Sequence, residues 1–150
     1  TPDGIAQCIA TARSLKSGRV ILVFGAGGDR DQHKRPLMAR AAMDADLVIV
    51  TSDNPRSEVP DRIIADIVAG FDPGADVLTF VDRQRGIREA LQRAQPGDVV
   101  VIAGRGHERT QHIGDRRICF DDRRVTRRLI LEILSGTFDR SGLQWSAIPA

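Results

Sequence analysis

Residues 20–28 read Val20-Ile21-Leu22-Val23-Phe24-Gly25-Ala26-Gly27-Gly28. Five consecutive apolar residues predict a strand that is buried on both faces, because a strand with one wet face alternates apolar and polar residues. The glycines that follow predict a tight turn that uses positive φ angles, which glycine adopts without strain. Strands buried on both faces are typical of parallel sheets that helices cover on each side.

The rest of the chain repeats this unit, with apolar runs alternating with amphipathic helical patterns. The apolar runs occupy 47–50, 77–80 and 99–103, and the helical patterns occupy 1–15, 36–43, 63–68 and 82–94. We therefore expect an α/β fold, a Rossmann-like and mostly parallel sheet with helices on both faces.

Two short segments around a Gly-Asp turn, at 111–113 and 117–120, predict a hairpin-like pair. This pair is expected to add an antiparallel edge strand to the sheet. A last helical pattern completes the predicted domain, residues 1–136. Residues 137–150 have no clear period and are predicted to be a C-terminal tail.

Composition argues against several kinds of partner. Lys+Arg 22 against Asp+Glu 20 leaves a net charge of only +2, and aromatic residues make up 4%, so neither a basic stripe nor stacking aromatics indicate nucleic-acid binding. No apolar run reaches the ~20 residues that cross a bilayer, so no membrane contact is expected. Cys8 and Cys119 match no metal-binding spacing and suit a reducing compartment, so we expect no metal site and a cytoplasmic location.

Polar and glycine-rich loops follow three of the four predicted strands, at 25–30, 52–56 and 104–108. Ligands of parallel sheets bind outside the carboxyl ends of the strands, where these loops would lie. One shared site is therefore expected at this edge of the sheet.

The first loop allows two interpretations. It could cradle a dinucleotide, but the third glycine of GxGxxG would fall at Arg30. The alternative is a tight turn after the strand. Arg30 itself favours a small anion, because a guanidinium can bind a carboxylate through two hydrogen bonds.

The second and third loops contain side chains that suit an amino acid. Arg56 could bind a carboxylate and Asp53 an ammonium group, although an Asx-type turn with a surface salt bridge explains the same residues. Glu108 could accept an ammonium group, and His107 could act as an acid–base group or have a structural role. The phosphate-binding pattern GxxxxGK[ST] is absent from the chain, so no means of hydrolysing ATP by itself is visible.

Four segments together resemble one known family, the MurE type of Mur ligase. They are Phe24-Gly25-Ala26-Gly27-Gly28-Asp29-Arg30-Asp31, Lys34-Arg35-Pro36, Asp53-Asn54-Pro55-Arg56 and Ala103-Gly104-Arg105-Gly106-His107-Glu108. The chain resembles the C-terminal domain of that family from Thr1 to about Leu134. The resemblance implies that the family's N-terminal domain and central ATPase domain are absent from this chain.

The resemblance also implies a function. The full enzyme uses ATP and Mg²⁺ to add meso-diaminopimelate to UDP-MurNAc-L-Ala-D-Glu, an amide-forming step of bacterial peptidoglycan precursor synthesis. The C-terminal domain would bind the incoming amino acid and be inactive alone, with no catalytic residue of its own and no cofactor bound tightly.

The resemblance assigns a role to each residue of the predicted site. Arg56 and Asn54 would bind a carboxylate of meso-diaminopimelate while Asp53 orders the turn. Arg30 would face a carboxylate, and the Gly104 carbonyl and Glu108 would hold the far amino group. Residues implied to support the loops or the nucleotide are Gly27, Gly28, Asp29, Lys34 and His107.

Alternatives and departures from the family pattern remain. A related Mur-type ligase could add another amino acid such as L-lysine, the chain could be a free-standing nucleotide-binding module, or it could be an interaction domain. Arg105 stands where the family usually has Lys, Thr110 where an aromatic is common, and Ser52 where an acid is common.

Overall fold

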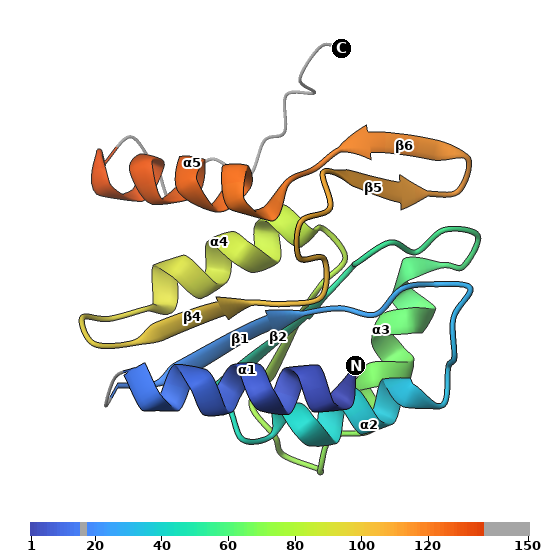
Figure 1. The fold of residues 1–150 in the computed structure, drawn as a ribbon, viewed down its shortest axis with the longest axis horizontal. Helices are drawn as coiled ribbons and strands as arrows, with labels where there is room; N and C mark the ends of the chain where they lie inside the picture. The colour runs from blue at the N-terminus through green and yellow to red at the C-terminus, as the bar shows by residue number, and fades with distance from the viewer. Residues whose placement is uncertain (16–17, 137–150) are drawn as a thin grey trace.

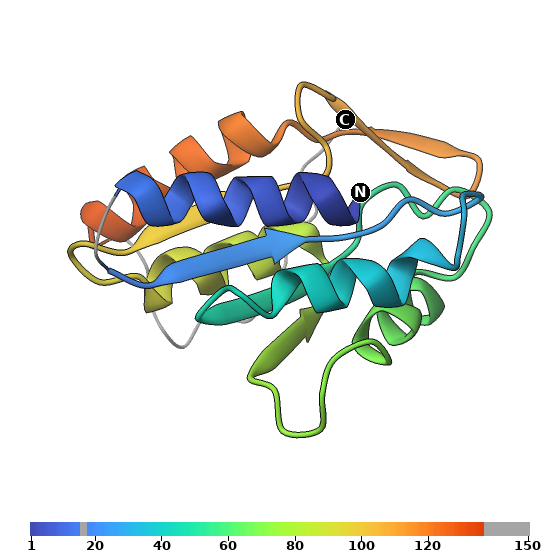
Figure 2. The same cartoon turned by 60° about the horizontal axis from the view of Figure 1, so that its bottom comes forward.

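A computed structural model describes residues 1–15 and 18–136 of the chain. Its centre is a four-stranded parallel sheet in the order β3-β2-β1-β4, which Figures 1 and 2 show from two directions. The strands are β1 (Val20–Phe24), β2 (Leu47–Thr51), β3 (Val77–Phe80) and β4 (Val99–Ile102). The predicted α/β fold with a parallel sheet is confirmed.

Helices cover both faces of the sheet, as predicted. On one side lie α1 (Pro2–Leu15), α2 (Lys34–Ala42) and α3 (Pro60–Val68), and on the other α4 (Arg83–Arg93) and α5 (Asp122–Leu134). Each strand connects to the next through a helix that runs back along the sheet. All carboxyl ends of the strands therefore meet at one edge.

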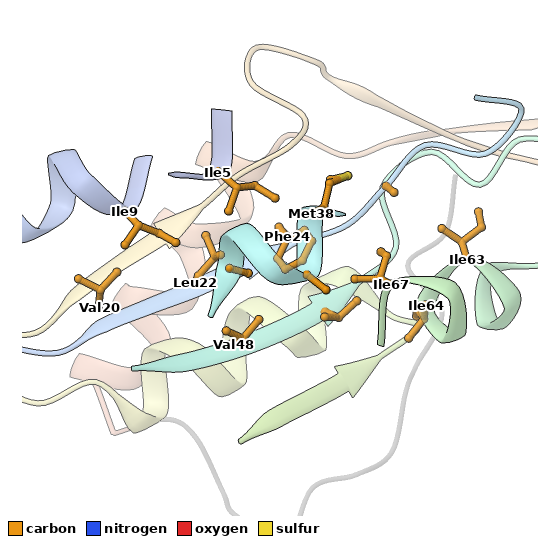
Figure 3. Packing of buried hydrophobic residues seen from close by; sticks show 14 of the residues in the cluster. Ile5, Ile9, Val20, Leu22, Phe24, Met38, Val48, Ile63, Ile64 and Ile67 are labelled. Carbon is orange, nitrogen blue, oxygen red and sulfur yellow. The ribbon is translucent and has the colours of Figure 1, made fainter. Parts of the chain in front are cut away.

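Two hydrophobic clusters form the core, one on each face of the sheet. Within β1, Leu22 and Phe24 belong to the cluster under α1, α2 and α3, which Figure 3 shows. The intervening Ile21 and Val23 belong to the cluster under α4 and α5. Each of these four side chains is at most 1% exposed. Burial of alternate residues on opposite faces is why the strand reads as one continuous apolar run.

Helix boundaries differ little from those predicted. The second helix begins at Lys34, two residues before the predicted start at Pro36. A proline fits within a first helical turn, because the backbone N–H groups there have no partner inside the helix. Asp82 caps the start of the helical pattern at 82–94, since its carboxylate accepts a hydrogen bond from the Arg85 N–H at 3.1 Å.

Some apolar residues of the helices stay in solvent. The 3–4 spacing of Cys8, Leu15 and Ile130 with their apolar neighbours predicts that they face the core. In the structure Cys8 is exposed, Leu15 is 66% exposed and Ile130 is 40% exposed. Each helix contacts the sheet along one stripe, so apolar residues at the margin of the stripe stay in solvent.

The antiparallel strands do not extend the main sheet. β5 (Thr110–Ile113) and β6 (Arg116–Cys119) form a separate two-stranded sheet, so the predicted antiparallel edge strand is wrong in position. Only Gln111 of the hairpin is buried, and a hairpin without an apolar face gains little by packing on the edge of a core sheet. Its backbone pairs with the main domain through a parallel bridge between Ile113 and Arg56, just past the end of β2.

The opposite edge of the sheet is held by Asp98, which precedes β4. Its carboxylate accepts hydrogen bonds from the Arg19 backbone N–H at 2.9 Å, from the Arg19 guanidinium at 2.7 Å and from the Gln95 N–H at 3.0 Å. The Arg19 guanidinium makes the largest contribution in lowering the pKa of Asp98 from 3.8 to about 2. Asp98 therefore stabilises the fold above its ordinary pKa, and this stabilisation is lost as the pH falls from about 4 to about 2.

We expect Asp98→Asn to remove this pH dependence. Urea unfolding between pH 2 and 5 would show a smaller fall in the free energy of unfolding for Asp98→Asn than for the wild type. Asp44→Asn, at an exposed aspartate, is the control. Its free energy of unfolding should change with pH as steeply as that of the wild type. If the free energy of unfolding changed equally with pH in the wild type and in Asp98→Asn, the stabilising role of the Asp98 carboxylate would be contradicted.

Candidate functional site

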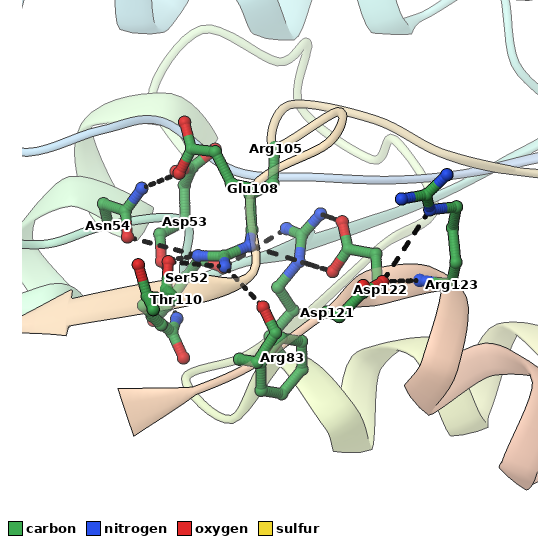
Figure 4. Close-up of polar contacts among 12 residues, drawn as sticks. Ser52, Asp53, Asn54, Arg83, Arg105, Glu108, Thr110, Asp121, Asp122 and Arg123 are labelled. Carbon is green, nitrogen blue, oxygen red and sulfur yellow. Dashed lines mark hydrogen bonds and ion pairs between the residues drawn. The ribbon is translucent and has the colours of Figure 1, made fainter. Parts of the chain in front are cut away.

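The loops after β1, β2 and β4 meet at the carboxyl edge of the sheet. The Gly28 N–H donates to the Asn54 carbonyl at 2.8 Å, which joins the first loop to the second. The Asn54 Nδ2 donates to the Glu108 Oε2 at 2.5 Å, which joins the second loop to the third (Figure 4). Residues far apart in the sequence are thus brought into one cluster.

The glycines of the first loop serve close packing. A Cβ at Gly28 would lie 1.9 Å from the Pro55 carbonyl oxygen, and one at Gly25 would lie 2.1 Å from the Thr51 carbonyl oxygen. The expectation that this turn uses positive φ at its glycines is wrong, because the residue there with positive φ is Asp29, at 54°. Gly25 and Gly28 let the first loop pack directly on the backbone of the second.

Asp29 and its neighbours complete the first loop. The Ser57 hydroxyl and N–H donate to the Asp29 carboxylate at 2.5 and 3.3 Å, and these bonds lower the pKa of Asp29. Lys34 is exposed, with its Nζ 3.8 Å from an Asp31 carboxylate oxygen, and His107 is exposed in the third loop. Asp29 therefore has a clear structural role, whereas Lys34 and His107 face solvent.

Arg56 adopts a rare backbone conformation. Its φ is 53°, in the left-handed region that costs a non-glycine residue about 1–2 kcal/mol. The hairpin holds it there, because the Arg56 N–H donates to the His112 carbonyl at 3.0 Å and its carbonyl accepts from the Gly114 N–H at 2.6 Å. Strain of this kind persists only where surrounding contacts enforce it, and it is common at ligand-binding positions.

The Arg56 side chain turns back over the first loop. Its Nη1 donates to the Gly28 carbonyl at 2.5 Å. A Cβ at Gly27 would lie 2.9 Å from this nitrogen and 3.6 Å from the Arg30 Cγ, so Arg30 and Arg56 both approach Gly27. Neither forms a salt bridge within the described part of the chain, although both positive charges act on the nearby Asp29 carboxylate and help to lower its pKa. Two guanidinium groups therefore lie beside Gly27, where an acidic ligand could bind.

Asp53 packs against the third loop. The residue is 8% exposed, and its Oδ2 lies 2.8 Å from where a Cβ at Gly104 would be. Burial raises the pKa of Asp53, an effect that the positive charges of Arg83 and Arg105 oppose. Gly104 has a φ of 109°, a conformation in which a side chain would be strained. This contact packs the second loop directly against the third.

Three buried arginines hold the cluster together, and sequence analysis selected none of them as functional. Arg83, at the start of α4, pairs with Asp122 through two bonds of 2.8 Å and also donates to the Ser52 and Ala103 carbonyls. It thus joins the ends of β2 and β4 to the start of α5. An arginine in the first turn of a helix gives no sign of this in sequence, because its partner lies 39 residues away.

Arg35 also joins separate segments, near the first loop. Its guanidinium binds Glu58 and Asp66, each at 2.8 Å, and Glu58 also accepts from the Asp29 N–H at 2.6 Å. The third, Arg105, contacts the second loop and the hairpin. Charged residues are rarely buried without partners, so these contacts are the reason the three arginines can occupy the interior.

The described residues offer no obvious place for a metal ion. Over residues 1–15 and 18–136, no three His, Cys, Asp or Glu side chains are grouped so that they could hold one. The cluster instead combines guanidinium donors with carboxylate and carbonyl acceptors, which suits a zwitterionic ligand.

Comparisons with known proteins show which family the chain resembles. A family model described as "Mur ligase, glutamate ligase domain" matches residues 1–106. A UDP-N-acetylmuramoyl-L-alanyl-D-glutamate–2,6-diaminopimelate ligase of Parasynechococcus marenigrum is 52% identical over 124 residues, which are 82% of this chain and 25% of the relative. The ligase of the same name from Geobacillus thermodenitrificans is 50% identical over 134 residues, 88% of this chain and 27% of the relative.

A solved structure of a ligase of this name superposes with a TM-score of 0.85 and 46% sequence identity. The superposition covers 89% of this chain and 28% of that chain. The chain thus spans about a quarter of the length of the curated relatives it matches. On the extent of these matches, it belongs to the Mur ligase C-terminal domain family.

Proposed function

We propose that the chain is the amino-acid-binding domain of an ATP-dependent amide ligase that adds meso-diaminopimelate to UDP-MurNAc-L-Ala-D-Glu in peptidoglycan precursor synthesis. The observation that carries this proposal is the convergence of Arg56, Asn54 and Glu108 on one edge of the sheet. The names of the similar ligases support the same substrate. The domain alone is proposed to be inactive.

The cluster suits the zwitterionic end of such a ligand. The Arg56 guanidinium and the Asn54 Nδ2 are donors for its carboxylate, and Glu108 and the Gly104 carbonyl are acceptors for its ammonium group. Arg30 would bind a carboxylate beside Gly27. In this proposal, Asp53 orders the turn without touching the ligand.

Other parts of the complete ligase would supply the rest of the reaction. In the complete ligase, ATP with Mg²⁺ would phosphorylate the D-Glu carboxyl group of the UDP-linked dipeptide. The amine of the incoming amino acid would then displace the phosphate to form the amide. We propose that the central ATPase and N-terminal domains of the complete ligase hold ATP and Mg²⁺ together with the UDP-linked dipeptide. The residues proposed to support the nucleotide-facing side of the loops are Gly27, Gly28, Asp29, Lys34 and His107.

We propose that the reaction takes place in the cytoplasm, in keeping with the cysteine usage of the chain. Within residues 1–15 and 18–136, no helix is both long and apolar enough to cross a bilayer.

Ligand titration of the ¹⁵N-labelled chain, followed by NMR, tests the proposal. Millimolar meso-diaminopimelate is expected to shift the backbone amide signals of Asn54, Arg56 and Glu108. L-Lysine lacks the second carboxylate and is expected to shift them less. Shifts of the first-loop amides with NAD, combined with none for meso-diaminopimelate, would instead indicate a nucleotide-binding module and contradict the proposal.

A further inference from the structure

Arg105 occupies the centre of the polar cluster. It is 2% exposed, although it lies in a turn between two glycines with positive φ, Gly104 at 109° and Gly106 at 54°. The turn directs its side chain inward, toward the second loop and the hairpin (Figure 4). A buried guanidinium needs acceptors for its five N–H groups, so its partners indicate what it organises.

Its hydrogen-bond acceptors belong to two different parts of the site, while its Nε, which has no hydrogen-bond partner, lies 3.8 Å from the Asp122 Oδ1 at the start of α5. Nη2 donates to the Thr110 and Phe120 carbonyls, both at 2.9 Å, and the guanidinium lies over the Phe120 ring at 5.4 Å. Nη1 donates to the Asn54 Oδ1 at 3.2 Å and lies 3.4 Å from the Asp53 carbonyl oxygen. One planar group therefore connects the hairpin to the loop that carries Asn54.

The side-chain amide of Asn54 has only one orientation that fits these contacts. Its Oδ1 accepts from Arg105 Nη1 and from the His112 N–H at 2.9 Å. Its Nδ2 donates to Glu108 at 2.5 Å. A reversed amide would place its N–H groups against two other donors and its oxygen against a carboxylate, leaving all of these groups unsatisfied.

We propose that Arg105 is a positioning residue that holds the Asn54 side chain with its N–H₂ group directed into the site. One N–H of this group donates to Glu108, so the other can donate to a carboxylate oxygen of the ligand, while an ammonium group is left to Glu108. This inference rests on the proposed function, since it explains how that site recognises an acidic end of its amino acid.

Kinetics of the complete ligase test the inference. Arg105→Met keeps much of the side-chain volume but removes the donors, and we expect it to raise the KM for meso-diaminopimelate about tenfold or more. The KM values for ATP and the UDP-linked dipeptide should stay within about twofold, because Arg105 acts through Asn54. Arg105→Lys restores a charged donor but not the planar guanidinium group. Its KM for meso-diaminopimelate should lie between those of the wild type and Arg105→Met, about threefold above the wild type.

Two further variants complete the test. Arg109→Met removes an exposed arginine of the same loop and should behave as the wild type. Asn54→Asp still offers acceptors to Arg105 and His112 but places a carboxylate where the N–H₂ group was, so its KM for meso-diaminopimelate should rise at least as much as that of Arg105→Met. Should Arg105→Met fail to fold, the KM of Arg105→Lys and that of Asn54→Asp decide the question.

The inference would be overturned if the KM for meso-diaminopimelate were unchanged in Arg105→Met or in Asn54→Asp, whatever happens to the melting temperature. Arg105 would then have only a structural role. A wild-type ligase that does not use meso-diaminopimelate would overturn the proposed function instead, whatever the variants do, so the two failures are distinguishable.

Discussion

Arg56→Ala in the complete ligase is expected to raise the KM for meso-diaminopimelate about a hundredfold or more, because a charge-assisted pair to the ligand carboxylate is lost. The wild-type side chain is held by the Gly28 carbonyl and by a backbone conformation that the hairpin enforces. It therefore meets the ligand already oriented. Steady-state kinetics with meso-diaminopimelate and L-lysine measure the effect.

The comparison with L-lysine shows whether Arg56 selects the substrate. Because L-lysine lacks the second carboxylate, its use should change much less, and the preference for meso-diaminopimelate should collapse in Arg56→Ala. Arg56→Lys keeps the charge but loses the two-pronged geometry, so most of the preference should also be lost. Arg40→Ala, at an exposed arginine of α2, is the matched control. A preference for meso-diaminopimelate that survives in Arg56→Ala would refute the selector role.

The second large effect concerns stability. Asp122→Ala is expected to lower the free energy of unfolding by about 3–5 kcal/mol, because it leaves the Arg83 guanidinium buried without its counter-charge. The Arg83 side chain is 0% exposed and its two bonds to Asp122 are both 2.8 Å long. Urea denaturation of the chain measures the loss.

An exposed ion pair provides the control for that experiment. Glu89 and Arg93 lie one turn apart on α4, at 2.6 Å, with about half of the arginine side chain in solvent. Glu89→Ala should cost no more than about 0.5 kcal/mol, as is usual for exposed pairs. A loss for Asp122→Ala as small as that for Glu89→Ala would contradict the role given to the buried pair.

The position of the site follows from patterns that are local in the sequence. Continuous apolar runs such as Val20–Phe24 mark strands buried on both faces, and parallel strands place the loops that follow them at one edge. Asn54, Arg56 and Glu108 could therefore be expected to meet before any coordinates were known. Neither the separate hairpin nor the left-handed backbone of Arg56 was visible at this level.

The spacing of apolar and polar side chains depends only on residues that are close in the sequence. This spacing therefore determined the sheet, the helices that cover it and the edge where the loops gather. Pairing between distant residues was decided only by the tertiary structure. Arg83 meets Asp122 and Arg105 meets Asn54 across 39 and 51 positions. An arginine in solvent and one in the interior look alike in sequence, because what differs is the set of acceptors that the folded chain brings to them.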